Sequence, residues 1–138
     1  MAIIVFDTKD CETIRIKFNL FNVQGLIPLI TRVYLDNDSG PMTTKPIFTS
    51  NELNTDASIE LTKPFKHYKG LLFFETFLSY KTFPNLKKEQ VLEIAKNLSP
   101  VYQIHDCDNQ FKEFLKAENI DIVESKKWIY LTKTFDLI

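Results

Sequence analysis

The sequence predicts an α+β fold, with two helices packed on one face of a mainly antiparallel sheet. Several short segments alternate apolar and polar residues or are continuously apolar, which is typical of β-strands. Residues 86–98 and 109–118 instead carry apolar residues at helical spacing. Because a chain of 138 residues has the size of one domain, we expect residues 1–138 to share a single core.

The first two predicted strands lie near the N-terminus. Residues 2–6 form a compact run of residues that favour strands, and residues 13–22 alternate between apolar and polar side chains. The apolar face of the second segment consists of Ile14, Ile16, Phe18 and Leu20. We expect the two segments to form an antiparallel hairpin across the polar residues 8–12.

The next part of the chain is less regular. Residues 26–35 fit both the helical and the strand period, but their β-branched and aromatic residues favour a strand from about Leu29. Pro28 would then lie at the start of the strand, where a missing N–H is tolerated. Residues 36–58 show no sustained period, and we expect a long irregular loop in which residues 47–49 are a candidate short strand. Residues 59–61 are another candidate strand.

Residues 71–83 are the aromatic centre of the sequence. Both alternating faces of this segment are partly apolar, which indicates a central strand covered on both sides, with a helix as the alternative. The clearest helix follows at residues 86–98, where Asn85 can cap the first turn and Ser99-Pro100 can end the last.

The C-terminal region is predicted to contain a short strand, the second helix and a β-hairpin. The strand covers residues 101–104, and Asp108 can cap the helix at 109–118. The C-terminal hairpin follows from about residue 120, with its turn at residues 125–127 and with alternating residues from Trp128 onward.

Composition excludes the common phosphate-binding devices. The chain has 3 glycines and 12 phenylalanines, and the isolated glycines cannot form a glycine-rich phosphate loop or a nucleophile elbow.

The formal net charge is −1, from 17 basic and 18 acidic residues. Because a protein that neutralises many phosphates has an excess of basic residues, nucleic acid is not the expected partner. Arg15 and Arg32 are the only arginines available for recognising a carboxylate or phosphate.

The cysteines and the apolar stretches indicate a compartment. The two cysteines lie far apart without a CxxC motif, which favours a reducing environment. No secretory signal precedes the first strand, and no apolar stretch is long enough to span a bilayer. We therefore expect a cytoplasmic protein without a membrane partner.

The densest polar cluster could carry nucleophilic chemistry. Cys107 would lie at the N-terminus of the second predicted helix, where the helix dipole favours a thiolate, and His105 or His67 could serve as the base. Its two acidic neighbours, Asp106 and Asp108, instead raise the pKa of a thiol and can cap the helix. No spacing typical of a metal site is present, so neither a metal nor a cofactor is predicted.

Aromatic residues are the better indication of a binding surface. Most of them must form the core, but Phe48, Trp128 and Tyr130 are candidates for a surface patch that contacts a partner, together with Lys126 and Lys127 at the hairpin tip. We expect this surface to combine the 36–58 loop with the edge of the terminal hairpin. Glu75 lies within the aromatic run, where we expect it to point to solvent or to pair with a lysine such as Lys81.

These observations favour a small non-enzymatic protein–protein interaction module, such as an inhibitor, an immunity-type protein, a phage accessory protein or an assembly adaptor. Its partner is another protein, and an exposed strand edge with surface aromatics would permit a homodimer. One alternative is a small enzyme that uses Cys107 with His105 or His67. A second is a weak nucleic-acid binder that uses the C-terminal helix and hairpin as a winged helix, with Lys126 and Lys127 at the tip.

Overall fold

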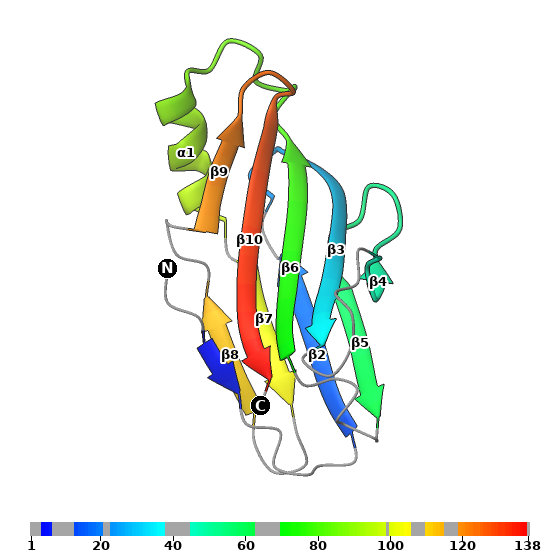
Figure 1. The fold of residues 1–138 in the computed structure, drawn as a ribbon. Coiled ribbons are helices and arrows are strands. Elements are labelled where there is room, and N and C mark those ends of the chain that lie inside the picture. The colour runs from blue at the N-terminus through cyan, green and yellow to red at the C-terminus, as the bar shows by residue number, and fades with distance from the viewer. Residues whose placement is uncertain are drawn as a thin grey trace.

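Two β-sheets pack face to face to form a sandwich (Figure 1). The computed structural model describes residues 4–6, 13–20, 23–37, 45–62, 70–98, 100–105, 110–114 and 119–137. Within these residues the larger sheet contains β1 (Ile4–Phe6), β3 (Ile27–Asn37), β4 (Phe48–Thr49), β6 (Gly70–Ser79), β9 (Ile120–Val123) and β10 (Trp128–Leu137). The smaller sheet contains β2 (Thr13–Leu20), β5 (Ala57–Thr62), β7 (Pro100–His105) and β8 (Gln110–Phe114).

The order of the strands places β6 and β10 at the centre of the larger sheet. This sheet runs β1–β10–β6–β3–β4, and β9 pairs with β10 on the side away from β6. The long strands β3, β6 and β10 are antiparallel neighbours, whereas the short β1 pairs parallel to the end of β10. The smaller sheet runs β5–β2–β7–β8 and is antiparallel throughout.

Strict alternation along the strands builds the core between the two sheets. Alternate residues of β6 and β10 are fully buried, and those between them are half-buried, because successive side chains point to opposite faces. The main core cluster comprises Ile14, Ile16, Phe18, Val33, Leu35, Ala57, Leu72, Phe74, Tyr102, Ile104, Phe135 and Leu137. Phe74 lies edge to face with Tyr102 and with Phe135, and the ring centroids of Phe74 and Tyr102 are 5.2 Å apart.

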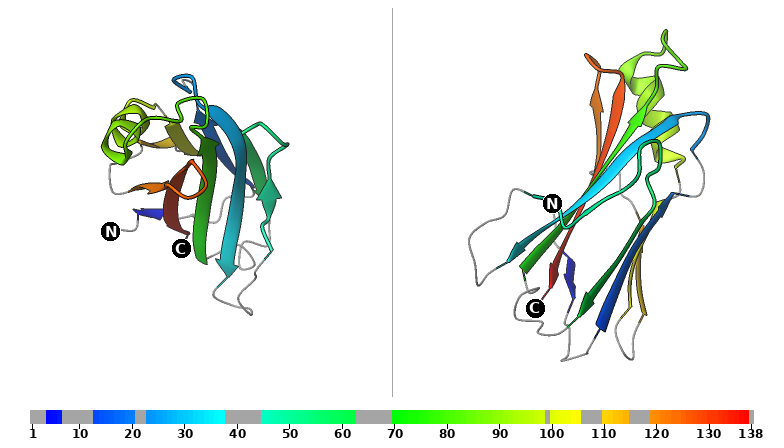
Figure 2. Two further views of the ribbon diagram at one scale, coloured as in Figure 1. Left: turned by 90° about the horizontal axis from the view of Figure 1, so that it is seen from above. Right: turned by 90° about the vertical axis from the view of Figure 1, so that its right-hand side faces the viewer.

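The helix α1 (Lys88–Lys96) closes one end of the sandwich. The larger sheet extends past the smaller one at this end, and α1 lies beside its strand β9 (Figure 2). Val91 and Ala95 of α1 are buried in a second core cluster, to which β6 contributes Leu78 and β10 contributes Ile129. The inner face of the larger sheet is therefore covered by the smaller sheet at one end and by α1 at the other.

The predicted α+β arrangement, with two helices on one face of a single sheet, is wrong. The described residues contain one α-helix, and they form two mainly antiparallel sheets that face each other. Of the segment predicted as the second helix, residues 110–114 form β8, which pairs with β7 in the register Val101↔Phe114 to His105↔Gln110. Pairing with β7 provides hydrogen-bond partners for the backbone N–H and C=O groups of this segment. Its apolar pattern is too short to stabilise a helix alone.

The expected N-terminal hairpin is also wrong, because β1 and β2 belong to different sheets. Ile4 of β1 lies opposite Phe135 of β10, and Ile16 of β2 lies opposite Ile59 of β5 and Ile104 of β7. The predicted helix at 86–98 is present in shortened form as α1, whose N-cap is Lys87 and not Asn85.

Several predicted strands are confirmed. The ambiguous segments 26–35 and 71–83 contain β3 and β6, and the candidate strands at 47–49 and 59–61 correspond to β4 and β5. The C-terminal hairpin is formed by β9 and β10, with Lys127 in its turn at a φ of 58°. β6 is central, but no described element covers its outer face, which corrects the expectation of cover on both sides.

Candidate functional site

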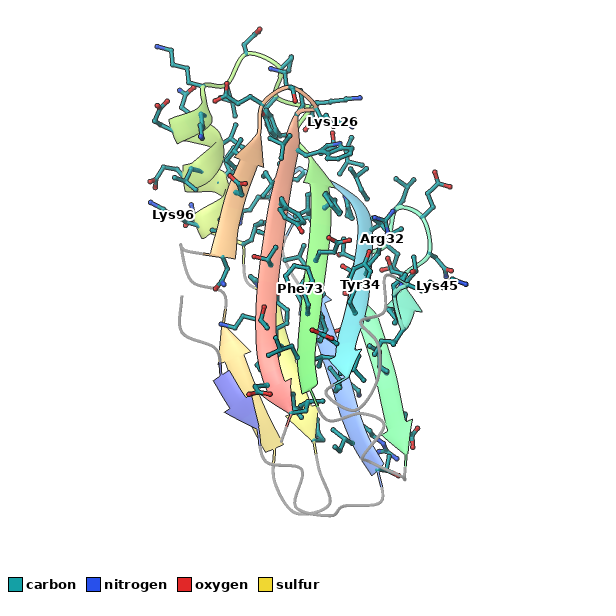
Figure 3. All side chains as sticks on the ribbon, in the orientation of Figure 1. Arg32, Tyr34, Lys45, Phe73, Lys96 and Lys126 are labelled. Carbon is teal, nitrogen blue, oxygen red and sulfur yellow. The ribbon has the colours of Figure 1, made fainter. Side chains whose placement is uncertain are left out.

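The two outer faces of the sandwich differ in chemistry. Half-buried aromatic and charged side chains occupy the outer face of the larger sheet: Arg32, Tyr34, Phe73, Glu75, Phe77, Trp128 and Tyr130. Exposed or half-buried polar side chains dominate the outer face of the smaller sheet: Arg15, Lys17, Asn19, Ser58, Glu60, Gln103 and His105. An antiparallel sheet that faces only water carries polar residues on that side, as the smaller sheet does. The aromatic outer face of the larger sheet is therefore the candidate contact surface (Figure 3).

An aromatic row crosses the strand pair β6–β10 on this face. Phe77 of β6 lies opposite Tyr130 of β10, and their rings stack with 4.8 Å between the centroids. Phe77 also meets Trp128 edge to face, with 5.2 Å between the ring centroids. The ammonium group of Lys126 lies 4.7 Å from the centre of the Trp128 ring, which is a cation–π contact. These contacts hold the rings in one arrangement, so the row is a preformed surface.

Glu75 is the centre of a polar network beside the aromatic row. Its two carboxylate oxygens accept hydrogen bonds from the Tyr34 hydroxyl at 3.1 Å and from the Tyr130 hydroxyl at 2.9 Å. The Arg32 guanidinium lies 3.5 Å from the same carboxylate, and the Arg32 side chain is 41% exposed against 12% for Glu75. The partner of Glu75 is therefore Arg32, not Lys81 as expected, because Arg32 and Glu75 are directly paired across β3 and β6.

Both tyrosines of the network stay protonated at neutral pH. Burial raises the pKa of Tyr130, and the hydrogen bond to the Glu75 carboxylate and its negative charge raise this pKa further. The pKa of Tyr34 is raised by the same causes, against which the positive charge of Arg32 acts. Tyr34 and Tyr130 are therefore hydrogen-bond donors that fix the position of Glu75.

A pocket of about 320 Å³ lies next to the aromatic row. Its apolar walls are formed by Leu29, Ile30, Leu53, Phe77 and Trp128, and its two charged groups are Arg32 and Glu52. The register between β3 and β6 shifts between Pro28 and Ile30. Such a bulge breaks the alternation of the strand, which explains how the consecutive residues Leu29 and Ile30 line the same pocket.

The segment 50–54 forms the rim of this pocket and is tied to the edge of β3. The backbone N–H of Leu53 donates to the Leu29 carbonyl at 2.9 Å, and the N–H of Thr31 donates to the Ser50 hydroxyl at 2.9 Å. The Ser50 hydroxyl donates in turn to the Asn54 carbonyl. Leu53 has a φ of 62°, a left-handed conformation that is unfavourable for leucine, and it is 62% exposed. The hydrogen bonds hold this strained residue at the rim.

The residues predicted to bind a partner do not all lie on this face. Trp128 and Tyr130 lie in the aromatic row, with Lys126 over the Trp128 ring. Phe48 instead packs against the core between the sheets. The ammonium group of Lys127 lies 5.7 Å from the centre of the ring of Tyr80, which is buried in the second core cluster.

The catalytic candidates are not brought together by the described part of the structure. His105 is half-buried at the end of β7, on the polar outer face of the smaller sheet and opposite Arg15. Cys107 and His67 lie outside the described residues. No cluster of three or more potential metal ligands occurs among the residues that the structure describes. The helix-and-hairpin outline of a winged helix is overturned, because residues 110–114 form a strand of the smaller sheet.

Sequence reasoning named Glu75 but missed its partners Arg32, Tyr34 and Tyr130, and it missed the exposed Leu53. The signal for the first was present in the sequence, since Arg32 is one of two arginines and Glu75 is the one charged residue within residues 70–80. Their pairing depends on the register of β3 against β6, which neither segment reveals alone. The sequence around Leu53 did not indicate an exposed apolar position, because this segment has no sustained hydrophobic period.

Comparison with protein-family models, with curated proteins and with solved structures finds no match for this chain. None of the helices within the described residues combines the length and the apolar character needed to traverse a lipid bilayer.

Proposed function

We propose that this protein is a non-enzymatic binding module that contacts another protein through the outer face of its larger sheet. The observation that carries the proposal is the pocket, to which the 36–58 segment contributes Glu52 and Leu53 and the terminal hairpin contributes Trp128. Two segments that are distant in sequence thus meet at one preformed aromatic surface. Aromatic residues and arginine are enriched at the centres of protein interfaces, and this face contains both.

The charge pattern supports a protein partner more than a nucleic acid. Arg32 and Lys126 are accompanied on this face by Glu52 and Glu75, so its described residues mix both signs of charge instead of forming a run of positive charge. A phosphate backbone needs several unopposed cations, whereas a protein surface can present both signs.

The experiment that tests this function compares two matched substitutions on opposite faces. Trp128→Gln removes one of the aromatic side chains that line the pocket. Arg15→Gln removes an exposed side chain from the outer face of the smaller sheet. Tagged wild-type protein and both variants are passed through lysate of the source cells, and the captured proteins are identified. We expect a partner that wild type and Arg15→Gln retain and that Trp128→Gln loses, with an affinity loss of about tenfold or more in a binding titration.

Folding has to be controlled in this comparison. Urea unfolding of both variants verifies that each is folded under the conditions of capture. Equal retention of the partner by both folded variants would move the binding surface away from this face. If neither wild type nor variants capture any protein in a stoichiometric amount, the proposal of a protein-binding module is wrong.

A further inference from the structure

The rim of the pocket presents a protruding apolar side chain beside an apolar hollow. Leu53 is 62% exposed, which is the largest exposure of any bulky apolar side chain within the described residues. It lines the same pocket as Leu29, Ile30, Phe77 and Trp128. The pocket volume of about 320 Å³ is sufficient for a leucine side chain from another molecule. A protrusion and a matching hollow thus lie side by side on one face.

The charged groups at the pocket are self-complementary as well. Arg32 and Glu52 carry opposite charges on the same rim. Glu52 is exposed and has no hydrogen bond or ion pair within the part of the chain that the structure describes. The Arg32 side chain is 41% exposed although its guanidinium lies 3.5 Å from Glu75, and because a guanidinium has five N–H donors, further donors are available for a second carboxylate.

A dimer with a twofold axis needs a surface patch that is complementary to itself. In an isologous interface the same patch of each copy contacts the other, so each protrusion must have its hollow on the same face. A twofold axis that passes between Leu53 and the pocket brings Leu53 of one copy to the pocket of the other. Because Arg32 and Glu52 line the same pocket, the interface then contains one charge of each sign from each copy. Such an interface allows a guanidinium of one copy to pair with a carboxylate of the other beside the apolar contact.

We propose that two copies of this chain associate through the outer faces of their larger sheets, with each Leu53 inserted into the pocket of the other copy. The inference rests on the proposed function, because it assigns an occupant to the same surface. It adds a form of regulation, since a second copy and a different protein partner cannot occupy the surface together. Self-association then lowers the concentration of chains that are free to bind the partner.

Leu53→Asn is the most informative variant. Asparagine tolerates the left-handed backbone conformation better than leucine, so this substitution removes the apolar protrusion without adding strain to the fold. We expect wild-type protein to change from monomer to dimer in sedimentation velocity as its concentration rises. Leu53→Asn should weaken this association about tenfold or more while its thermal midpoint stays equal or rises.

Ile47→Asn is the matched control. Ile47 is 40% exposed and lies in the neighbouring segment, but it does not line the pocket. This control should dimerise as wild type does. The proposal is wrong if wild type stays monomeric at all accessible concentrations, or if Leu53→Asn dimerises with unchanged affinity.

A charge reversal tests the orientation of the two copies. Glu52→Lys would place a lysine opposite Arg32 of the second copy and should weaken dimerisation more at low salt than at high salt. Glu60→Lys makes the same change of charge on the smaller sheet and should leave dimerisation unchanged. Equal effects of the two variants would contradict the twofold arrangement.

The two proposals fail in different ways. A monomeric wild type whose partner is lost in Trp128→Gln excludes the second copy and retains the binding module. A dimer that depends on Leu53 but captures no other protein supports the dimer and excludes the binding module as stated.

Discussion

Tyr102 places in the core a hydroxyl group that has no hydrogen-bond partner among the residues that the structure describes. The residue is fully buried between the sheets, and its ring packs against Phe18 at 4.7 Å and Phe74 at 5.2 Å between centroids. A buried polar group without a partner costs free energy because it has lost its hydrogen bonds to water. The aromatic ring stabilises the core at this position, whereas the hydroxyl does not.

We therefore expect Tyr102→Phe to raise the free energy of unfolding by about 1 kcal/mol, since it removes the unsatisfied group and keeps the ring. Urea unfolding measures this change. Tyr130→Phe is the control, because its hydroxyl donates to Glu75, and its removal should lower the stability by about 1 kcal/mol. A loss of stability in Tyr102→Phe would mean that this hydroxyl has a partner.

Alkaline pH tests the burial of the tyrosine side chains. Burial raises the pKa of Tyr34, Tyr80, Tyr102 and Tyr130 in the folded protein. In the unfolded chain these groups release their protons near about pH 10. The folded state then holds more protons than the unfolded state, so stability falls as pH rises above about 10 and is independent of these groups well below it.

The measurement combines urea unfolding from about pH 8 to about pH 11 with the absorbance of ionised tyrosine. We expect the unfolding midpoint to decrease over the upper part of this range, with tyrosine ionisation appearing as the protein unfolds. Full ionisation of the tyrosines in a still folded protein would contradict the burial of these rings.

Among the elements, α1 begins with an unfavourable residue. Its N-cap is Lys87, whose backbone N–H donates to the Gln90 side chain at 2.9 Å. A lysine side chain has no acceptor for the free N–H groups of the first turn, and its positive charge opposes the helix dipole. The helix is therefore held by the burial of Val91 and Ala95 more than by its own terminus.

Lys87→Asp should raise the free energy of unfolding by about 1 kcal/mol, because aspartate both accepts from the first turn and favours the dipole. Thermal unfolding gives the change. Asn85→Asp adds a carboxylate two residues earlier and should leave the stability nearly unchanged. If Asn85→Asp stabilised the protein and Lys87→Asp did not, the helix would begin earlier than described.

The elements also show what the sequence can and cannot predict. Period-two alternation in residues 13–20 and 128–137 identifies strands directly, because one face of each strand is buried. For 109–118, Phe111 and Phe114 suggest a helical face, yet residues 110–114 are a strand. Pairing with β7 decides the conformation of this short segment, and a local pattern contains no information on that partner.

Only part of the contact surface was predictable, because a sequence pattern shows which residues share a face of one strand but not which elements are neighbours. Trp128 and Tyr130 could be placed on one face from their spacing within a single strand. The pairing of Arg32 with Glu75 and the position of Leu53 beside Trp128 depend on contacts between separate elements. Residue type indicated that these side chains could bind, and only the fold shows which of them lie together.

For the whole molecule, the main feature is the difference between its two outer faces. The smaller sheet shows Lys17, Glu60 and Gln103 to solvent, whereas the larger sheet shows Phe77, Trp128 and Tyr130 around a pocket. Both inner faces are already buried, by the opposite sheet or by α1. The aromatic outer face is therefore not needed for the core of a single copy, which is why both proposals assign a partner to it.

The pairing of β1 with β10 has a consequence for synthesis on the ribosome. Ile4 pairs with Phe135, so the first described strand has no neighbour in its sheet until the last one has been translated. At ordinary elongation rates this interval is on the order of ten seconds, during which the backbone groups of β1 are open to other chains. Nascent protein should therefore stay sensitive to protease in β1 until β10 has left the exit tunnel.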